Sequence, residues 1–510
     1  AYPLPERQGV RVHCVCQQAR GNLDTQPLGR WRHCFCKKQM RRNMQHRLIW
    51  FRDDLRVNDN AALSAALDCQ CDVAISAVFL SADSDWKDFH YGRNRLYYTE
   101  QLLRNLSEQL AALGIVLEVV RLDSYQAQVT WVAGYCESRS VTDLFLNQEY
   151  QWNERIRDHQ IVERLPDVTV HTYVDRVLMQ PGTVLTGDNR YYSVFSPFKR
   201  RWLSIYQEHA TGVFDFAGQS RESIRPSAWD PICDQPDSDL SLFPTTESDA
   251  RALLDEFVTQ RLTNYEANRN NPSVLGTSRL SGALARGLLS PRQCVQAAEV
   301  TLNRPITEFP SHAFSWINEL IWRDFYQHLL VGFPDLSKNK AFRPETERLR
   351  WRNNPLDIEA WKNGRTGIPI VDAGMRELAT TGWMHNRVRM IVAQFLTKNL
   401  LCDWRIGEAH FMKYLVDSDL GSNNGGWQWS ASTGTDAAPY FRVFNPVSQG
   451  ETHDPDAEYV TRFIPELASV PIKKRHSPWS ATLPDRYPAP IVDLKSSRQR
   501  AIDAFKELKS

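Results

Sequence analysis

Short apolar runs alternate with longer amphipathic segments between residues 47 and 175, and this alternation constrains the fold more than any other feature. Apolar runs separated by helical patterns, such as that of residues 93–113, are typical of a parallel sheet with helices on both faces. Such sheets bind ligands at the carboxyl ends of their strands. We therefore predict a five-stranded parallel, Rossmann-like sheet, although no GxGxxG motif supports a nicotinamide dinucleotide. The predicted strands are RLIWF at 47–51, DVAISAVFL at 72–80, IVLEVVRL at 115–122, DLFLNQ at 143–148 and VTVHTYV at 168–174.

The pattern changes after the last predicted strand. Residues 176–245 are rich in Pro, Asp and Ser and predict a long linker. From residue 246 to 510 the periodicity is helical, with no convincing alternating strand, so we predict an all-α domain. The expected organisation is a poorly structured extension at 1–43, an α/β domain at 44–175, the linker, and the helical domain.

Charge is unevenly distributed along the chain. Residues 1–43 contain nine Lys and Arg against two Asp and Glu, a charge of +7. The whole chain carries +1, so residues 44–510 carry −6. A nucleic acid would therefore have to bind through a local basic patch, because overall charge gives it no support.

Four of the ten cysteines lie in the extension, in the motifs His13-Cys14-Val15-Cys16 and His33-Cys34-Phe35-Cys36. Zinc binding is one interpretation, but Cys-x-Cys is a tighter spacing than zinc sites generally use. The alternative is a leader or arm without a metal, and we expect no metal centre. The other cysteines are scattered, as reduced thiols are. With no apolar run long enough for a membrane span and no secretory signal pattern, we expect a cytoplasmic protein.

The stretch FSWINELIWRDFYQHLL at 314–330 places four unusual side chains on one helical stripe, at positions i, i+3, i+4 and i+7. A carboxylate among aromatic rings could hydrogen-bond a base or donate a proton. The alternative is a partly buried helix face with an internal ion pair. The four residues are Glu319, Trp322, Arg323 and Tyr326.

Two further segments suggest ligand binding. In TGWMHNRVRMIVAQFLTKNLL at 381–401, Asn386 can recognise an edge with both a donor and an acceptor, and Arg389 can form a fork to Asp417 or Asp419. Ordinary surface arginines are the alternative. In YEANRNNPSVLGTSRLS at 265–281, a turn with backbone N–H groups, hydroxyls and a cation suits a phosphate, although a helix cap uses the same residues.

The stretch DSDLGSNNGGWQWSASTGTD at 417–436 combines carboxylates, amides, paired glycines and two tryptophans without any Lys or Arg. Together with GTSRLS, WINELIWRDFY, GWMHNRVRM, DWR at 403–405 and WFRDDLRVNDN, it closely resembles the photolyase/cryptochrome family. The resemblance is greatest to bacterial class I photolyases for cyclobutane pyrimidine dimers, and it covers residues 44–510. Residues 1–43 have no counterpart in it.

The resemblance implies an FAD folded into a U shape inside the helical domain. Asn423 would face flavin N5, and Arg389 would pair with Asp417. The glycines would leave room for the isoalloxazine edge. The residues that would bind FAD are Tyr265, Thr277, Ser278, Arg279, Leu280, Ser281, Trp316, Arg323, Arg389, Asp417, Asp419 and Asn423.

The resemblance also implies light-driven splitting of a dimer in UV-damaged DNA by electron transfer from excited, reduced FAD. Trp427, Trp404 and Trp351 would form a chain that carries electrons from the surface to oxidised flavin. Glu319 and Asn386 would hydrogen-bond the flipped-out lesion. The implied DNA and lesion contacts are Arg269, Glu319, Trp322, Arg323, Tyr326, Asn386, Arg387, Met390, Trp429 and Arg442.

A second chromophore is implied between the two domains. His90, Asn153, Glu154 and Lys338 match positions at which folate-using relatives hold 5,10-methenyltetrahydrofolate. A flavin or deazaflavin antenna, or a purely structural role for these residues, remains open.

Two positions distinguish the subfamilies. Photolyases for (6-4) photoproducts and animal cryptochromes resemble one another in a second His after the position of His385, where this chain has Asn386. Plant cryptochromes usually place Asp opposite flavin N5, where this chain has Asn423. These features, and the short segment after the domain, favour a repair enzyme for cyclobutane dimers. We expect the protein to act as a monomer. A cryptochrome photoreceptor, including the DASH type, is the alternative.

Overall fold

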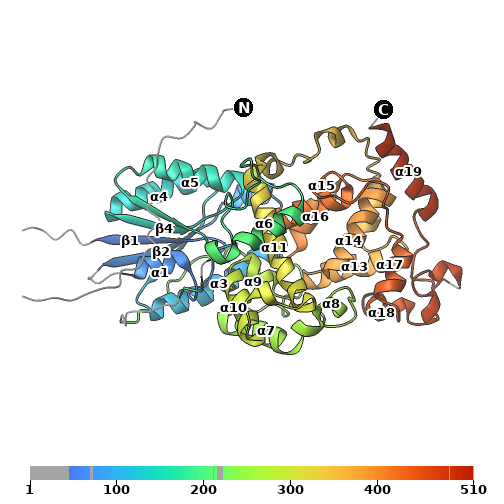
Figure 1. The fold of residues 1–510 in the computed structure, drawn as a ribbon, viewed down its shortest axis with the longest axis horizontal. Helices are drawn as coiled ribbons and strands as arrows, with labels where there is room; N and C mark the ends of the chain where they lie inside the picture. Colours follow the sequence, from blue (N-terminus) through green and yellow to red (C-terminus); the bar gives the residue numbers. More distant parts are fainter. Residues whose placement is uncertain (1–44, 69–72, 211, 215–221, 482, 509–510) are drawn as a thin grey trace, which may run out of the picture. The chain divides into compact units, whose positions relative to one another are not determined.

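The computed structural model describes residues 45–68, 73–210, 212–214, 222–481 and 483–508 (Figure 1). In these residues five parallel strands form one sheet in the order β3-β2-β1-β4-β5, as predicted. The central strand pairs on both sides, with Leu48 opposite Ser76 of β2 and Leu144 of β4. The strands are β1 (His46–Phe51), β2 (Ala74–Leu80), β3 (Val116–Val120), β4 (Asp143–Asn147) and β5 (Thr169–Tyr173).

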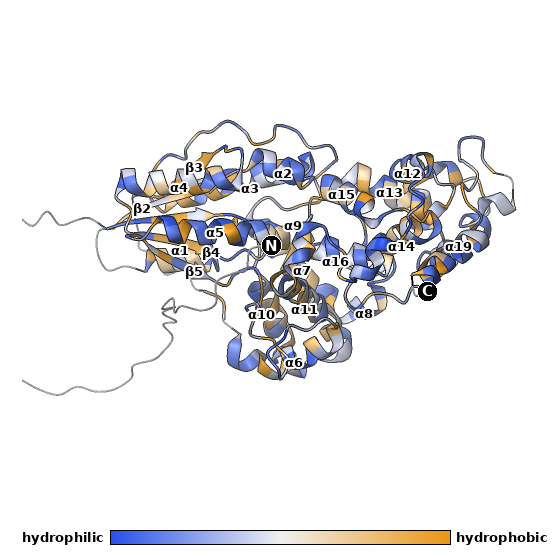
Figure 2. Cartoon of the chain, turned by 90° about the horizontal axis from the view of Figure 1, so that it is seen from above, coloured by the Kyte–Doolittle hydropathy of each residue, from blue (hydrophilic) through white to orange (hydrophobic). Residues whose placement is uncertain are grey.

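Helices cover both faces of this sheet because its central strands are apolar on both faces. Residues 48–51 of β1 are at most 1% exposed, as expected for a buried parallel strand. Figure 2 shows orange, hydrophobic strands between helices with blue, hydrophilic outer surfaces. The helices of this region are α1 (Ala61–Leu67), α2 (Asp83–Asp88), α3 (Arg93–Ala112), α4 (Tyr125–Arg139) and α5 (Trp152–Arg164).

Beyond β5 the described chain is helical. The stretch expected to be a linker contains one helix, α6 (Phe195–His209), whose apolar residues pack on α11. The other helices are α7 (Glu247–Gln260), α8 (Tyr265–Asn268), α9 (Ser281–Ala285), α10 (Pro291–Leu302), α11 (Ser311–Gly332), α12 (Pro355–Lys362), α13 (Pro369–Thr381), α14 (Asn386–Gln394), α15 (Trp404–Tyr414), α16 (Leu420–Ala431), α17 (Pro446–His453), α18 (Glu458–Phe463) and α19 (Leu494–Glu507). None of the described helices is both long and apolar enough to cross a membrane.

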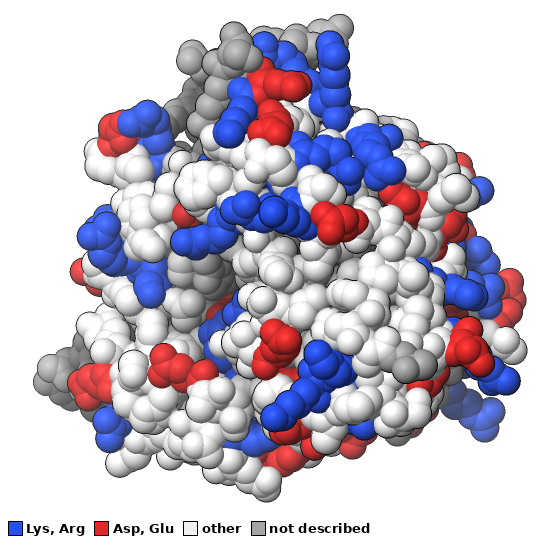
Figure 3. Space-filling view, turned by 90° about the vertical axis from the view of Figure 1, so that its right-hand side faces the viewer, with Lys and Arg blue, Asp and Glu red and all other residues white. Residues whose placement is uncertain are grey.

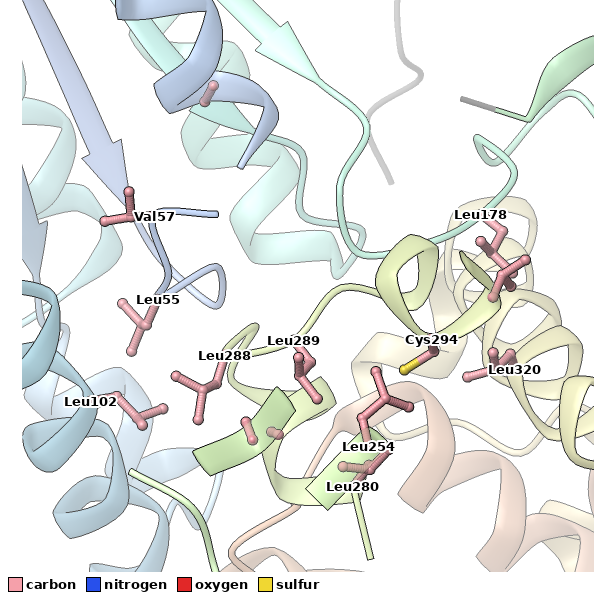
Figure 4. Close-up of a cluster of buried hydrophobic side chains, with 14 of the residues drawn as sticks. Leu55, Val57, Leu102, Leu178, Leu254, Leu280, Leu288, Leu289, Cys294 and Leu320 are labelled. Carbon is pink, nitrogen blue, oxygen red and sulfur yellow. The ribbon is translucent and has the colours of Figure 1, made fainter. Parts of the chain in front are cut away.

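One hydrophobic cluster extends from the sheet into the helical region (Figure 4). It contains Leu55 and Leu102 of the α/β region, Leu178 of the linker, and Leu254 and Leu288 of the helical region. The apolar segment that follows β1 packs directly on the helical region, so the α/β region and the helical region share this core.

A buried ionic cluster also joins the two regions. The carboxylate of Asp175, which follows β5, accepts hydrogen bonds from Arg56 at 2.6 and 3.0 Å and from Arg292 of α10 at 2.8 Å. Arg292 also pairs with Asp59 at 3.1 Å. All four side chains are at most 2% exposed, so the ion pairs lie in a medium where charges interact strongly.

Candidate functional site

A cavity of about 510 Å³, here called the central cavity, lies among α11, α14, α15 and α16. Its volume is within the range of small-molecule and cofactor sites. The cavity brings together Arg269, Ser281, Glu319, Trp322, Arg323, Tyr326, Asn386, Arg387, Arg389, Met390, Asp417, Asp419, Asn423, Trp427 and Trp429 of the predicted residues.

Helix α11 presents the predicted stripe to this cavity, but the ion pair differs from the one considered. Glu319 pairs with Arg269 of the segment after α8 at 2.7 Å, not with a cation of its own helix. Arg323 instead donates to two backbone carbonyls, those of Arg176 and Leu284. The ring of Trp322 stacks on Phe195, with centroids 3.6 Å apart and an interplanar angle of 7°. The stripe therefore offers a carboxylate and a braced aromatic face.

Helix α14 begins at Asn386, with the side chain of His385 as its N-cap. Arg389 donates to Asp417 at 2.8 Å, so the predicted pairing is with Asp417 rather than Asp419. Arg387 donates to the side-chain oxygen of Asn270 at 2.7 Å. The two cations of this helix are therefore held in place beside the cavity.

Helix α16 explains why glycines stand beside large rings in residues 417–436. Asp419 caps the helix by accepting from the backbone N–H of Ser422 at 2.9 Å. A side chain at Gly425 would collide with the ring of Tyr326, whereas Gly426 faces open space and lines the cavity. A side chain at Gly407 of α15 would likewise collide with Trp427. The glycines thus allow close packing on one side and leave an aromatic slot on the other.

Asn423 of α16 is oriented by a residue of the neighbouring helix α15. Its side-chain N–H donates to the backbone oxygen of Glu408 at 3.0 Å, and among the described residues its side-chain oxygen has no protein donor. The Glu408 carboxylate accepts from Asn424 at 2.9 Å, and burial raises the pKa of Glu408 to about 7. The arrangement leaves the amide oxygen of Asn423 available to accept from a ring N–H.

Sequence analysis missed other residues that line the cavity. Glu408 was also missed; it does not line this cavity, but its backbone oxygen accepts from Asn423, and nothing in its local sequence distinguishes it from a surface carboxylate. The apolar lining residues alternate with buried core residues at the same helical spacing, so no signal separates them. The additional lining residues are Ala393, Phe411, Leu415, Ser418, Ser422 and Ser430, whereas Gly426 is one of the glycines implied to leave room there.

Several predicted residues do not line the central cavity. Arg279 has a backbone φ of +55°, lies 5.5 Å from the ring of Trp383 and has a buried Nε without a protein partner. Arg442 is exposed in the loop before α17. The others lie around α8, α9 and α11, or in the proposed electron chain: Tyr265, Thr277, Ser278, Leu280, Trp316, Trp351 and Trp404.

Of the three tryptophans in the proposed chain, two are fully buried and the third is partly exposed. Trp427 is 2% exposed and lines the cavity, Trp404 is 1% exposed, and Trp351 is half-buried. The guanidinium of Arg405 lies 4.6 Å from the ring of Trp404. Two buried tryptophans and a half-buried third fit a route from the cavity toward the surface.

The residues around the central cavity fit an FAD. Buried polar atoms without a protein partner include Asp417 Oδ1, Ser418 Oγ and Trp427 Nε1. Buried polar atoms are normally hydrogen-bonded, so such a group of atoms indicates a polar ligand. A flavin has donors and acceptors along the edge of a flat ring, which suits this combination of amides, carboxylates and open aromatic slot.

A second cavity, of about 150 Å³, brings together the residues predicted to hold an antenna chromophore. His90, Asn153 and Glu154 line it, and the ammonium of Lys338 lies 4.0 Å from the ring of the lining residue Trp152. Burial and the nearby charge of Glu149 raise the pKa of Glu154 to about 7. The cavity is smaller than the roughly 300 Å³ of a typical ligand site, so a folate would bury only part of its surface there.

Among the described residues no group of His, Cys, Asp and Glu is arranged to hold a metal ion. The Cys-x-Cys motifs of the extension lie outside the residues that the structure describes.

Comparison with known proteins gives two family matches. Residues 47–213 match the family described as "DNA photolyase", and residues 316–507 match "FAD binding domain of DNA photolyase". A protein named "Deoxyribodipyrimidine photo-lyase" from Escherichia coli (strain K12) is 43% identical over 477 residues, which cover 91% of this chain and 98% of that protein.

Solved structures with the same fold include both functional classes. A bacterial class III photolyase from Agrobacterium tumefaciens has a TM-score of 0.80 and 31% identity, covering 93% of this chain and all of that chain. A cryptochrome from Synechocystis sp. PCC6803 has a TM-score of 0.79 and 26% identity, covering 90% of this chain and 99% of that chain.

Proposed function

The chain belongs to the DNA photolyase family, and from that premise we propose that it splits cyclobutane pyrimidine dimers in UV-damaged DNA. One observation carries the proposal: the residues expected to bind the lesion and those expected to bind flavin line the same cavity. Glu319 and Asn386 lie there with Asp417 and Asn423. A dimer in that cavity would therefore be next to its electron donor.

Bound FAD supplies the chemistry, which is the donation of one electron to the dimer after light absorption and its recovery once the ring has split. The protein holds and orients the reactants. Photolyases are among the enzymes known to extrude their target nucleotides from the duplex. Trp322, braced by Phe195, and Trp429 would stack on the extruded bases, at roughly 1–3 kcal/mol per base.

Polar residues of the cavity would fix the orientation of the dimer. Glu319 would accept a hydrogen bond from a base N–H, and Asn386 offers both a donor and an acceptor to the neighbouring polar edge. Met390 would pack against the bases. Four arginines would contact phosphates of the DNA backbone. Three of them line the cavity and the fourth is exposed: Arg269, Arg323, Arg387 and Arg442.

A local basic surface supports DNA binding by a chain whose net charge is only +1. Figure 3 shows one face on which Lys and Arg side chains form a band with few Asp and Glu among them, beside a largely uncharged area. Such a band can attract the DNA backbone locally.

We propose 5,10-methenyltetrahydrofolate as the antenna chromophore at the second cavity, held by His90, Asn153, Glu154 and Lys338. We further propose that the enzyme acts as a monomer in the cytoplasm and associates with the nucleoid, where its substrate is. The relatives named as photo-lyases at higher identity support a repair enzyme over a cryptochrome.

Light-dependent repair of defined duplexes would test the proposal. Purified, reduced protein is expected to repair a duplex with a cyclobutane dimer, only in light, and to leave a (6-4) photoproduct intact. The expected preference is at least about 100-fold, because the cavity has Asn386 where (6-4) enzymes have a His, and loss of a required polar partner costs several kcal/mol. No repair of either duplex by protein that binds flavin would favour a cryptochrome instead.

Replacing Glu319 with Ala is expected to lower repair of bound dimers by about tenfold while flavin is retained, since one hydrogen bond to the lesion is lost. Single-turnover repair on pre-bound substrate measures this. Arg269→Gln is the matched control, because it breaks the same ion pair but keeps the carboxylate. Equal repair rates in the two variants would mean that Glu319 only forms the ion pair with Arg269 and does not hydrogen-bond the lesion.

A further inference from the structure

A second buried ionic cluster, here called the junction cluster, connects the α/β region to the wall of the central cavity. It consists of Asp53 after β1, Arg95 of α3, Arg176 of the linker, Arg286 after α9, and Asp419. Arg176 bridges the two carboxylates, at 2.6 Å to Asp53 and 2.9 Å to Asp419. Arg286 pairs with Asp53, and Arg95 lies 3.6 Å from it. The side chains are at most 14% exposed.

Only Asp419 among the five lines the central cavity. Gln327 also donates to its carboxylate, at 3.2 Å to each oxygen. Burial alone would raise the pKa of Asp419, but the charges of Arg176 and Arg323 outweigh burial and lower it. The Asp419 carboxylate at the cavity wall is therefore ionised because it pairs with Arg176.

The cluster also fixes the backbone next to Asp419. The carbonyl oxygen of Ser418 accepts from Arg95 and from Arg286, both at 3.0 Å. The carbonyl oxygen of Arg176 accepts from Arg323, which lines the cavity. Arg176 thus positions two charged residues of the cavity wall. Its side chain holds the Asp419 carboxylate, and its backbone carbonyl holds the Arg323 guanidinium.

Stability alone is a weak explanation for such a cluster. Burying five charged groups costs desolvation energy, and apolar residues of similar size often stabilise a protein as well or better. With three arginines and two aspartates, the cluster also carries a net positive charge. A charge of fixed sign behind a cofactor wall changes the relative free energies of cofactor states that differ in charge.

We propose that Arg176 and Asp53 are positioning residues that act through Asp419 to set the balance between oxidised FAD and the anionic reduced form. The inference rests on the placement of FAD in the central cavity. Arg176 favours the reduced form because its charge opposes that of the anion. Asp53, on the far side of Arg176, has the opposite effect.

The two residues therefore have effects of opposite sign. Arg176→Gln removes a positive charge near the flavin, and Asp53→Asn removes a negative one. A unit charge acting through about 10 Å of protein changes the oxidation equilibrium by roughly 10- to 20-fold. We expect that shift toward oxidised flavin in Arg176→Gln and toward reduced flavin in Asp53→Asn, with the double variant close to wild type.

A redox titration of the FAD-loaded proteins, followed by flavin absorbance, tests this without any repair assay. Arg176→Lys keeps the charge and should titrate within about twofold of wild type, so the proposal stays testable if Arg176→Gln does not fold. Arg93→Gln is the control for loss of a surface cation, since Arg93 is 55% exposed.

Shifts in the same direction in both single variants, or no shift in either with flavin bound, would overturn the proposal and leave the repair function untouched. A purely structural cluster would instead lower the stability of both variants and leave their oxidation equilibria unchanged. Wild-type protein that holds no FAD would contradict the cofactor site itself, and the inference with it.

Discussion

Replacing Trp351 with Phe is expected to slow light-driven reduction of the bound flavin by about 100-fold, an added barrier of about 2.7 kcal/mol. Phe is much harder to oxidise than Trp, so the half-buried end of the proposed chain would no longer supply an electron. Repair by chemically reduced protein should stay within about twofold of wild type, because Trp351 does not line the central cavity. Absorbance under blue light measures the first rate, and dimer repair the second.

Trp131→Phe is the matched control for the loss of one partly exposed indole. Trp131 lies in α4, where it stacks on Tyr135 with centroids 4.9 Å apart, away from the central cavity. The Trp131→Phe variant should match wild type in both its rate of flavin photoreduction and its rate of dimer repair. If Trp351→Phe lowered repair and photoreduction to the same extent, the three tryptophans would not be a separate electron chain.

Replacing Asp175 with Ala is expected to lower the free energy of unfolding by roughly 3–5 kcal/mol, because Arg56 and Arg292 would remain buried without their counter-ion. Denaturant unfolding measures this loss. Asp503→Asn is the control, since Asp503 forms an exposed pair with Lys506 that should contribute about 0–1 kcal/mol. A loss from Asp175→Ala no larger than the loss from that control would contradict a structural role for the buried cluster.

Low pH should remove the contribution of Asp175 to the free energy of unfolding of the wild-type protein. Burial tends to raise the pKa of Asp175, but the charges of Arg56 and Arg292 outweigh it and hold the pKa at about 2. The folded pKa is thus below the unfolded value, so the stabilisation is complete above about pH 4 and is lost as pH falls toward 2. The stability difference between wild type and Asp175→Asn should therefore shrink over that interval.

Elements with strong local patterns could be predicted from the sequence. The five strands follow from apolar runs of the right length, and α11 and α14 follow from their helical periodicity. Helix α6 was not predicted, because it lies among Pro- and Asp-rich segments that indicate a linker. Its apolar residues have a periodicity that becomes clear only once α11 is available as a packing partner.

Site residues could be predicted where their chemistry is distinctive. An Arg beside an Asn on an apolar helix, and carboxylates beside glycines, indicated an ion pair of Arg389 with Asp417 or Asp419, and the structure has the pair with Asp417. The partner of Glu319 was missed because Arg269 is fifty positions earlier in the chain. Which of the predicted residues contact FAD, the antenna or DNA stays a prediction.

The junction cluster could not be predicted for the same physical reason. Its members come from five segments spread between positions 53 and 419, and each is an ordinary charged residue in its own local sequence. Only tertiary packing brings them within ion-pair distance. Sequence reasoning finds chemistry concentrated in one segment far more readily than chemistry assembled from many.

The hydrophobic cluster shared by the sheet and the helical region limits how this chain can be recombined with its relatives. A hybrid that took the light-harvesting half from one protein and the catalytic half from another would join mismatched apolar surfaces at Leu55, Leu178 and Leu288. Both sides of that seam would have to be transferred together. Exchange of antenna specificity is therefore constrained by the packing of this shared core as well as by the residues that line the second cavity.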